Sequence, residues 1–104
     1  MLYHIVIRFK YDRKKSEKLK RDPRRKIGFK EVQEIWDHPH YVDCRADYPE
    51  QFRSIGWVKG NLYSVIYEIR EDGDGEYNED GEYNHLVTLW KSTRQEEKIY
   101  EKYS

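Results

Sequence analysis

The sequence contains one cysteine and no long apolar run. The lone Cys44 excludes an internal disulfide and a zinc site built from several cysteines, which is typical of a protein in a reducing cytoplasm. No apolar run approaches the roughly 18 to 20 residues of a membrane span. The start, MLYHIVIRFK, carries no small-residue cleavage site after its apolar part. We therefore expect a cytoplasmic protein without a membrane segment.

Charged and aromatic residues are abundant, and the charges are unevenly distributed. The 104 residues include 20 Lys and Arg and 20 Asp and Glu, so the net charge is zero. Residues 1–30 carry 12 basic and 3 acidic side chains, a net charge of +9, whereas residues 71–84 carry 7 acidic and no basic ones. The basic part could attract phosphate groups. It is equally typical of a solvated helix surface.

The first forty residues predict one strand and two helices within a single domain (1–104). Residues 2–9 form an apolar run of strand length. Asp12 can cap a helix that runs to Arg21 and that Pro23 ends. A second helix is expected between Gly28 and Pro39, because apolar residues there recur at helical spacing. These are Phe29, Val32, Ile35 and Trp36.

From Tyr41 onward, apolar and polar residues alternate with the period of a strand. The alternation predicts strands at residues 41–45, 51–58 and 61–70, followed by one from about 83 to 91, with a hairpin turn around Gly60. Ser92 or Thr93 then caps a closing helix, and Glu96 completes a capping box with Thr93. Its expected inner face consists of Ile99, Tyr100 and Tyr103.

The order strand, helix, helix, four strands, helix predicts an α+β fold with an antiparallel sheet packed by helices. Between the last two strands lies a near-repeat, EDGDGEYN followed by EDGEYN. It has no aliphatic residue that could enter a core, so residues 71–84 are expected to form a projecting acidic loop. Its spacing does not fit a calcium-binding EF-hand loop.

The common cofactor and hydrolase motifs are absent. The sequence contains no Gly-rich phosphate loop, HExxH, CxxC or GxSxG. No neighbouring residue identifies a base that could activate Cys44, so an incidental thiol is the simpler interpretation. His38 and His40 flank Pro39, which is more typical of a turn than of a metal site. We expect no metal and no cofactor.

The end of the chain contains residues that metal-free RNA cleavage could use. Attack of a 2′-hydroxyl on its phosphate needs a base, an acid and cations. His85 or Glu68 could transfer protons, and Trp90 could stack on an unpaired base. Lys91, Arg70 and Arg94 could bind phosphate. Strict alternation would place His85 and Lys91 on one face and Trp90 on the other. The alternative interpretation is a core Trp beside surface cations.

Three parts of the sequence together resemble the BrnT family of toxin ribonucleases. FKYDRKKS, followed by IGFKEVQEIWDHP, is similar to the opening strand and two helices of that family. DCRADYPEQFRSIG and SVIYEIR are similar to its middle strands, and HLVTLWKSTRQEEKIYEKY to its closing strand and helix. The resemblance covers nearly the whole chain in the family's order and spacing.

The resemblance implies a RelE-like α+β fold and a cytoplasmic, RNA-cleaving toxin of a type II toxin-antitoxin system. It also implies a cognate antitoxin with a ribbon-helix-helix DNA-binding domain, and contact with operator DNA only through that complex. Lys91 becomes the strongest candidate for a catalytic cation, with Arg70, His85 and Glu68 beside it. Trp90, Arg94, Arg53 and Arg45 are the expected RNA-binding residues. Family motif positions fall on Glu50, Arg70, Lys91, Thr93, Glu96 and Tyr100.

The chain departs from the family pattern at several basic positions. The family's His-Gly after the first helix reads Arg25-Lys26, and the basic residue before the middle Phe reads Gln51. The residue before Lys91 is Trp90 instead of a basic one, and another basic position reads His85. These changes remove groups that could serve phosphate chemistry, while His85 adds one that titrates near neutrality.

Three hypotheses follow. In the first, the protein is an endoribonuclease toxin that cleaves mRNA without a metal. In the second, it is a catalytically silent toxin fold that binds an antitoxin or regulates an operon. In the third, the acidic segment 71–84 folds over the basic surface as a nucleic-acid mimic and restrains activity.

Overall fold

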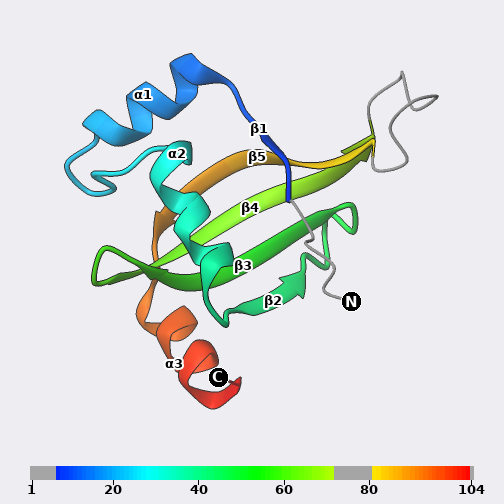
Figure 1. Cartoon of the computed structure of the whole chain (residues 1–104). Helices are drawn as coiled ribbons and strands as arrows, with labels where there is room; N and C mark the ends of the chain where they lie inside the picture. Colours follow the sequence, from blue (N-terminus) through cyan, green and yellow to red (C-terminus); the bar gives the residue numbers. More distant parts are fainter. Residues whose placement is uncertain (1–6, 72–80, 104) are drawn as a thin grey trace, which may run out of the picture.

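The structure is a computed structural model that describes residues 7–71 and 81–103 (Figure 1). One sheet carries helices on both of its faces. In chain order the elements are β1 (Phe9–Lys10), α1 (Arg13–Arg21), α2 (Phe29–Val32), the 3-10 helix η1 (Gln33–Asp37), β2 (Tyr41–Cys44), β3 (Gln51–Val58), β4 (Asn61–Glu71), β5 (Glu82–Lys91) and α3 (Arg94–Tyr103). The predicted α+β class is confirmed.

The sheet has five strands in the order β1-β5-β4-β3-β2. Strands β2 to β5 form the expected antiparallel meander. The prediction of an antiparallel sheet is wrong for β1, which pairs with β5 in parallel. Strand β1 forms the edge of the sheet next to β5, although the two strands are far apart in the sequence. Most of the predicted first strand, residues 2–6, lies outside the described residues.

A bulge in β5 changes which residues share a face. Ile66 of β4 pairs with Thr88, whereas the next residue, Tyr67, pairs with Leu86, so Val87 has no partner. An extra residue in one strand reverses the alternation beyond it. The predicted strict alternation is therefore wrong: His85 shares a face with Trp90 and not with Lys91.

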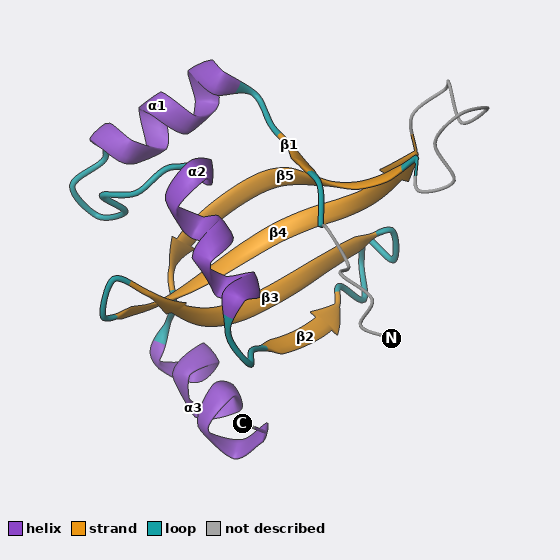
Figure 2. Ribbon diagram, in the orientation of Figure 1, coloured by secondary structure: helices purple, strands orange, loops and turns teal. Residues whose placement is uncertain are grey.

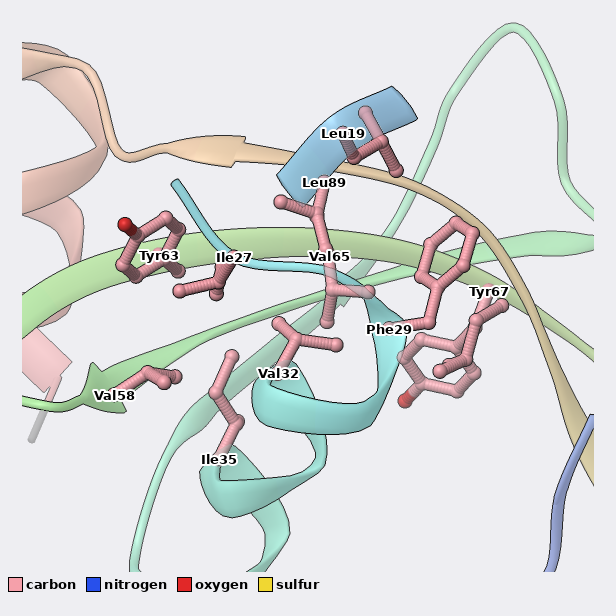
Figure 3. Packing of buried hydrophobic residues seen from close by; sticks show 11 residues of the cluster. Leu19, Ile27, Phe29, Val32, Ile35, Val58, Tyr63, Val65, Tyr67 and Leu89 are labelled. Atoms are coloured by element: carbon pink, nitrogen blue, oxygen red, sulfur yellow. The ribbon is translucent and has the colours of Figure 1, made fainter. Parts of the chain in front are cut away.

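The hydrophobic core lies between one face of the sheet and the helices α1, α2 and η1 (Figure 2). Phe29, Val32 and Ile35 are fully buried and lie against the strands (Figure 3). Leu19 is the apolar anchor of α1. The apolar residues whose spacing predicted an amphipathic second helix are thus the ones that are buried. Only Phe29–Val32 is α-helical, and Gln33–Asp37 continues as a 3-10 helix.

The helix caps follow local sequence chemistry. Asp12 Oδ1 accepts the backbone N–H groups of Lys14 and Lys15, at 2.9 and 3.2 Å. At α3, Glu96 Oε1 accepts the N–H of Thr93 at 2.9 Å, and Thr93 Oγ1 accepts the N–H of Glu96 at 3.2 Å, which confirms the capping box. Tyr103, expected on the inner face of this helix, stacks on Tyr41 of β2 with ring centroids 5.7 Å apart, although Tyr103 remains 64% exposed.

The strands on either side of the acidic segment extend into it, so fewer residues are left for a loop than the predicted 71–84. Glu71 is the last residue of β4 and pairs with Glu82, the first of β5. Backbone pairing continues into the acidic residues because the ladder uses main-chain groups. The rest of the predicted loop, residues 72–80, lies outside the described residues, and the mimic hypothesis depends on them.

The turn between β3 and β4 requires a left-handed backbone at two residues. Lys59 has φ 49° and Gly60 has φ 82°, and a Cβ on Gly60 would meet no atom within 4 Å. We expect Gly60→Ala to lower the free energy of unfolding by about 1 kcal/mol, entirely through backbone strain. Denaturant unfolding measures this. Lys59→Ala, which keeps a non-glycine residue at φ 49°, is the control, and equal stabilities of all three proteins would contradict the explanation.

Candidate functional site

The sheet face opposite the core carries most of the chemically active side chains. We call it the open face; α3 covers part of it. Alternation along β3 and β4 and the bulge in β5 place the following residues there: Gln51, Arg53, Ile55, Trp57, Ser64, Ile66, Glu68, Arg70, Tyr83, His85, Thr88 and Trp90.

A chain of polar contacts crosses this face from β2 toward β5. Arg45 Nη1 donates to Gln51 Oε1 at 3.3 Å, and Gln51 Nε2 donates to Glu68 Oε2 at 3.0 Å. Arg70 Nε donates to the other oxygen of Glu68 at 3.1 Å. The hydrogen bonds from Gln51 and Arg70 lower the pKa of Glu68, and its carboxylate raises the pKa of Arg70. Glu68 is therefore ionised at neutral pH, and it orients a cation.

His85 lies beside this ion pair. It is the direct cross-strand partner of Glu68 and, on its other side, of Lys10 in β1. Burial lowers the pKa of His85 below its ordinary value of 6.5, and the charge of Arg70 lowers it further, while Glu68 opposes both. The imidazole is therefore mainly neutral at pH 7 and can accept a proton.

Tyr83 joins Lys10 of β1, and Arg8 just before that strand, to the same group. It is the cross-strand partner of Arg70, and the Lys10 Nζ lies 4.4 Å from the centre of its ring. The Arg8 guanidinium is 6.0 Å from that centre. We call Lys10, Glu68, Arg70, Tyr83 and His85 the polar cluster. It combines a neutral imidazole, two cations, a phenol and a carboxylate on an exposed part of the sheet.

A second, more buried group fastens α3 to the open face. Arg53 contacts both oxygens of Asp43, with Nε to Oδ1 at 3.0 Å, and its Nη1 lies 3.2 Å from Glu96 Oε2. The indole Nε1 of Trp90 donates to Glu96 Oε1 at 2.8 Å. We call Asp43, Arg53, Trp90 and Glu96 the α3 anchor. Its hydrogen bonds explain why Arg53 has a raised pKa and why its guanidinium is occupied within the protein.

The structure brings together three of the four predicted catalytic residues. Glu68, Arg70 and His85 are neighbours on β4 and β5. Lys91 is not among them: it is six residues beyond His85, about 20 Å along the strand, and it shares the core face with Tyr63. The structure does not bring Lys91 to the other three residues, because six residues separate it from His85 and the bulge turns it to the other face; its catalytic role stays a prediction.

The four predicted RNA-binding residues lie in different places. Arg45 and Trp90 line the same hollow on the open face, and Arg53 forms one of its walls. Arg94 is exposed at the first turn of α3, three residues after Lys91 in the sequence. Arg45 and Trp90 therefore share one hollow, and Arg45 is linked to Glu68 of the polar cluster through Gln51.

The sequence did not place Lys10, Tyr83 or Gln51 in the site, although Gln51 was noted as a departure from the family pattern. Their positions depend on strand register, and Lys10 reaches His85 only through the parallel pairing of β1 with β5. The available signal was that Lys10 directly follows the predicted apolar strand, within the basic part of the chain. Arg25, noted as a departure from the family pattern, has a structural role, since its Nε donates to the Leu89 carbonyl at 2.8 Å.

Two further observations concern residues 7–71 and 81–103. No three His, Cys, Asp or Glu side chains gather there in a way that could hold a metal ion. No helix in these ranges is long and apolar enough to cross a membrane.

Comparison of the chain with known protein families, curated proteins and solved structures finds no match.

Proposed function

We propose that this chain is a metal-independent endoribonuclease with a RelE-like fold, the toxin of a type II toxin-antitoxin pair. It cleaves single-stranded regions of mRNA at the polar cluster. The observation that carries the chemistry is the placement of His85 next to Glu68, Arg70 and Lys10 on an exposed sheet face. The assignment as a toxin with a ribbon-helix-helix antitoxin rests on the motif resemblance, with which the α+β element order agrees.

The reaction proposed is an internal transesterification. Neutral His85 removes the proton of the 2′-hydroxyl, whose oxygen forms a bond to the adjacent phosphorus while the bond to the 5′-oxygen breaks. Arg70 stabilises the negative charge that develops on the phosphoryl oxygens. Lys10 protonates the departing 5′-oxygen, so the products are a 2′,3′-cyclic phosphate and a 5′-hydroxyl. The proton on His85 then returns to solvent or to Lys10.

Glu68 acts here as a positioning residue and not as the proton donor. Its pKa is lowered by Gln51 and Arg70, so it holds no proton at neutral pH. It fixes the Arg70 guanidinium and faces the imidazolium that forms on His85. The basic helix α1, with Lys and Arg at most of its exposed positions, adds long-range attraction for the RNA backbone.

The test of the function is cleavage of a labelled mRNA by the purified protein in excess EDTA. We expect discrete products that carry cyclic phosphate ends. RNA in which every 2′-hydroxyl is methylated is the control, and it should stay intact because the attacking group is blocked. Cleavage of both RNAs, or activity that EDTA abolishes, would contradict the proposed chemistry.

A second candidate function is a catalytically silent toxin fold that binds an antitoxin and helps regulate its operon. The observation that favours it is the Arg70–Glu68 ion pair, which occupies a cation and a carboxylate that phosphate chemistry would use. This candidate predicts that a folded protein binds its antitoxin and leaves RNA intact, with or without ribosomes.

A further inference from the structure

The open face contains a hollow of about 300 Å³ between β2 and the end of β5. Trp90 and Ile66 form its apolar side, and the segment after β2, including Arg45 and Asp47, forms its rim. We propose that this hollow is a nucleobase subsite that takes guanine from the RNA strand. The inference rests on the proposed RNA-cleaving function and specifies which base that site selects.

The apolar side of the hollow is held in place by the α3 anchor. The Trp90 indole is fixed through its Nε1 hydrogen bond to Glu96, a residue whose side chain is 6% exposed. Ile66 is 1% exposed on the same face. A ring held rigidly next to an aliphatic floor offers a flat apolar surface, and unpaired bases stack on such aromatic surfaces whatever their sequence.

The rim supplies the polar contacts that would choose among bases. Arg45 Nη2 lies 3.6 Å from Asp47 Oδ2, so a guanidinium and a carboxylate stand next to each other at the mouth. Guanine offers O6 and N7 as acceptors for an arginine, together with N1–H and N2–H groups that a carboxylate can accept. Cytosine and uracil lack the N7 acceptor and present less surface for stacking.

The hollow is close enough to the polar cluster to set the position of cleavage. Ile66 and Glu68 point to the same face of β4 and are two residues apart, about 7 Å. Gln51 connects the two places directly, because it accepts from Arg45 and donates to Glu68. A guanine in the hollow would therefore present its neighbouring phosphate to His85 and Arg70.

The test is equilibrium binding of short single-stranded oligonucleotides with 2′-O-methyl groups, which cannot be cleaved. A central guanine is compared with adenine, cytosine and uracil at fixed salt. We expect the wild type to bind the guanine oligonucleotide about 10-fold more tightly than the adenine, cytosine and uracil ones, since adenine carries a donor where guanine has O6. Arg45→Ala, which leaves α3 untouched, and Trp90→Leu should both lose this difference.

Trp57→Leu is the matched control, since Trp57 is 49% exposed on the same face but packs on Tyr100 outside the hollow. It should keep the preference. Equal affinity for all four bases, or a preference that survives Arg45→Ala, would overturn the subsite. Cleavage without base preference would overturn the subsite alone, whereas a guanine preference without any cleavage would overturn the proposed function alone.

Discussion

Replacing His85 with alanine is expected to lower the rate of RNA cleavage by about 10²- to 10⁴-fold, the usual contribution of a general base. The reason is that His85 is the group in the polar cluster that is both mainly neutral at pH 7 and able to accept a proton. The measurement is single-turnover cleavage of a labelled RNA. Because the pKa of His85 lies below 6.5, the wild-type rate should fall only as the pH drops below that value.

Two variants sharpen this experiment. His38→Ala removes an exposed histidine from the turn after η1 and should leave the rate unchanged. Lys91→Ala tests whether the catalytic cation expected from the sequence takes part in cleavage. Lys91 lies about 20 Å along β5 from His85, so we expect the rate to stay unchanged. A large loss in Lys91→Ala with none in His85→Ala would place the chemistry at the other end of the strand.

Replacing Glu96 with alanine is expected to lower the free energy of unfolding by about 2 to 3 kcal/mol, because a partly buried donor loses its acceptor while Arg53 keeps its other partner, Asp43. The carboxylate of Glu96 accepts from the Trp90 indole and the Thr93 amide and contacts Arg53. Its removal leaves the Trp90 indole N–H without an acceptor and takes one of two carboxylates from Arg53. Urea unfolding, followed by circular dichroism, measures the change.

Glu97→Ala is the control, since Glu97 is the exposed neighbour in the same helical turn. Its stability should stay within about 0.5 kcal/mol of the wild type, as is usual for a surface substitution. Glu96→Gln should fall between the two, because an amide keeps an acceptor for Trp90 but loses the charge that faces Arg53. A Glu96→Ala protein as stable as the Glu97→Ala protein would show that the α3 anchor contributes little.

The parts of the fold that depend on local chemistry could be predicted from the sequence. The strand predicted at residues 51–58 is observed as Gln51–Val58, and the turn falls at Lys59 and Gly60 as expected. The capping box is also local, since Thr93 and Glu96 are three residues apart. In each case the side chains that decide the structure are close neighbours in the chain.

The candidate site depended on features that are not local. Glu68, Arg70 and His85 were identified by their chemistry, but the bulge at Val87 determines which face His85 occupies. Main-chain pairing between distant strands creates the contact of Lys10 with His85, and no side-chain pattern encodes it. For the same reason Lys91, which has suitable chemistry, falls outside the group.

The α3 anchor also has a consequence for motion. Glu96 is the buried residue of α3, and the helix also meets the sheet through the rings of Tyr100 and Tyr103, whereas the core lies on the opposite face. A unit held in this way can open without disturbing the rest of the molecule. Amide hydrogens of α3 should therefore exchange with solvent through local opening, before the central strands unfold, and each opening would release Trp90.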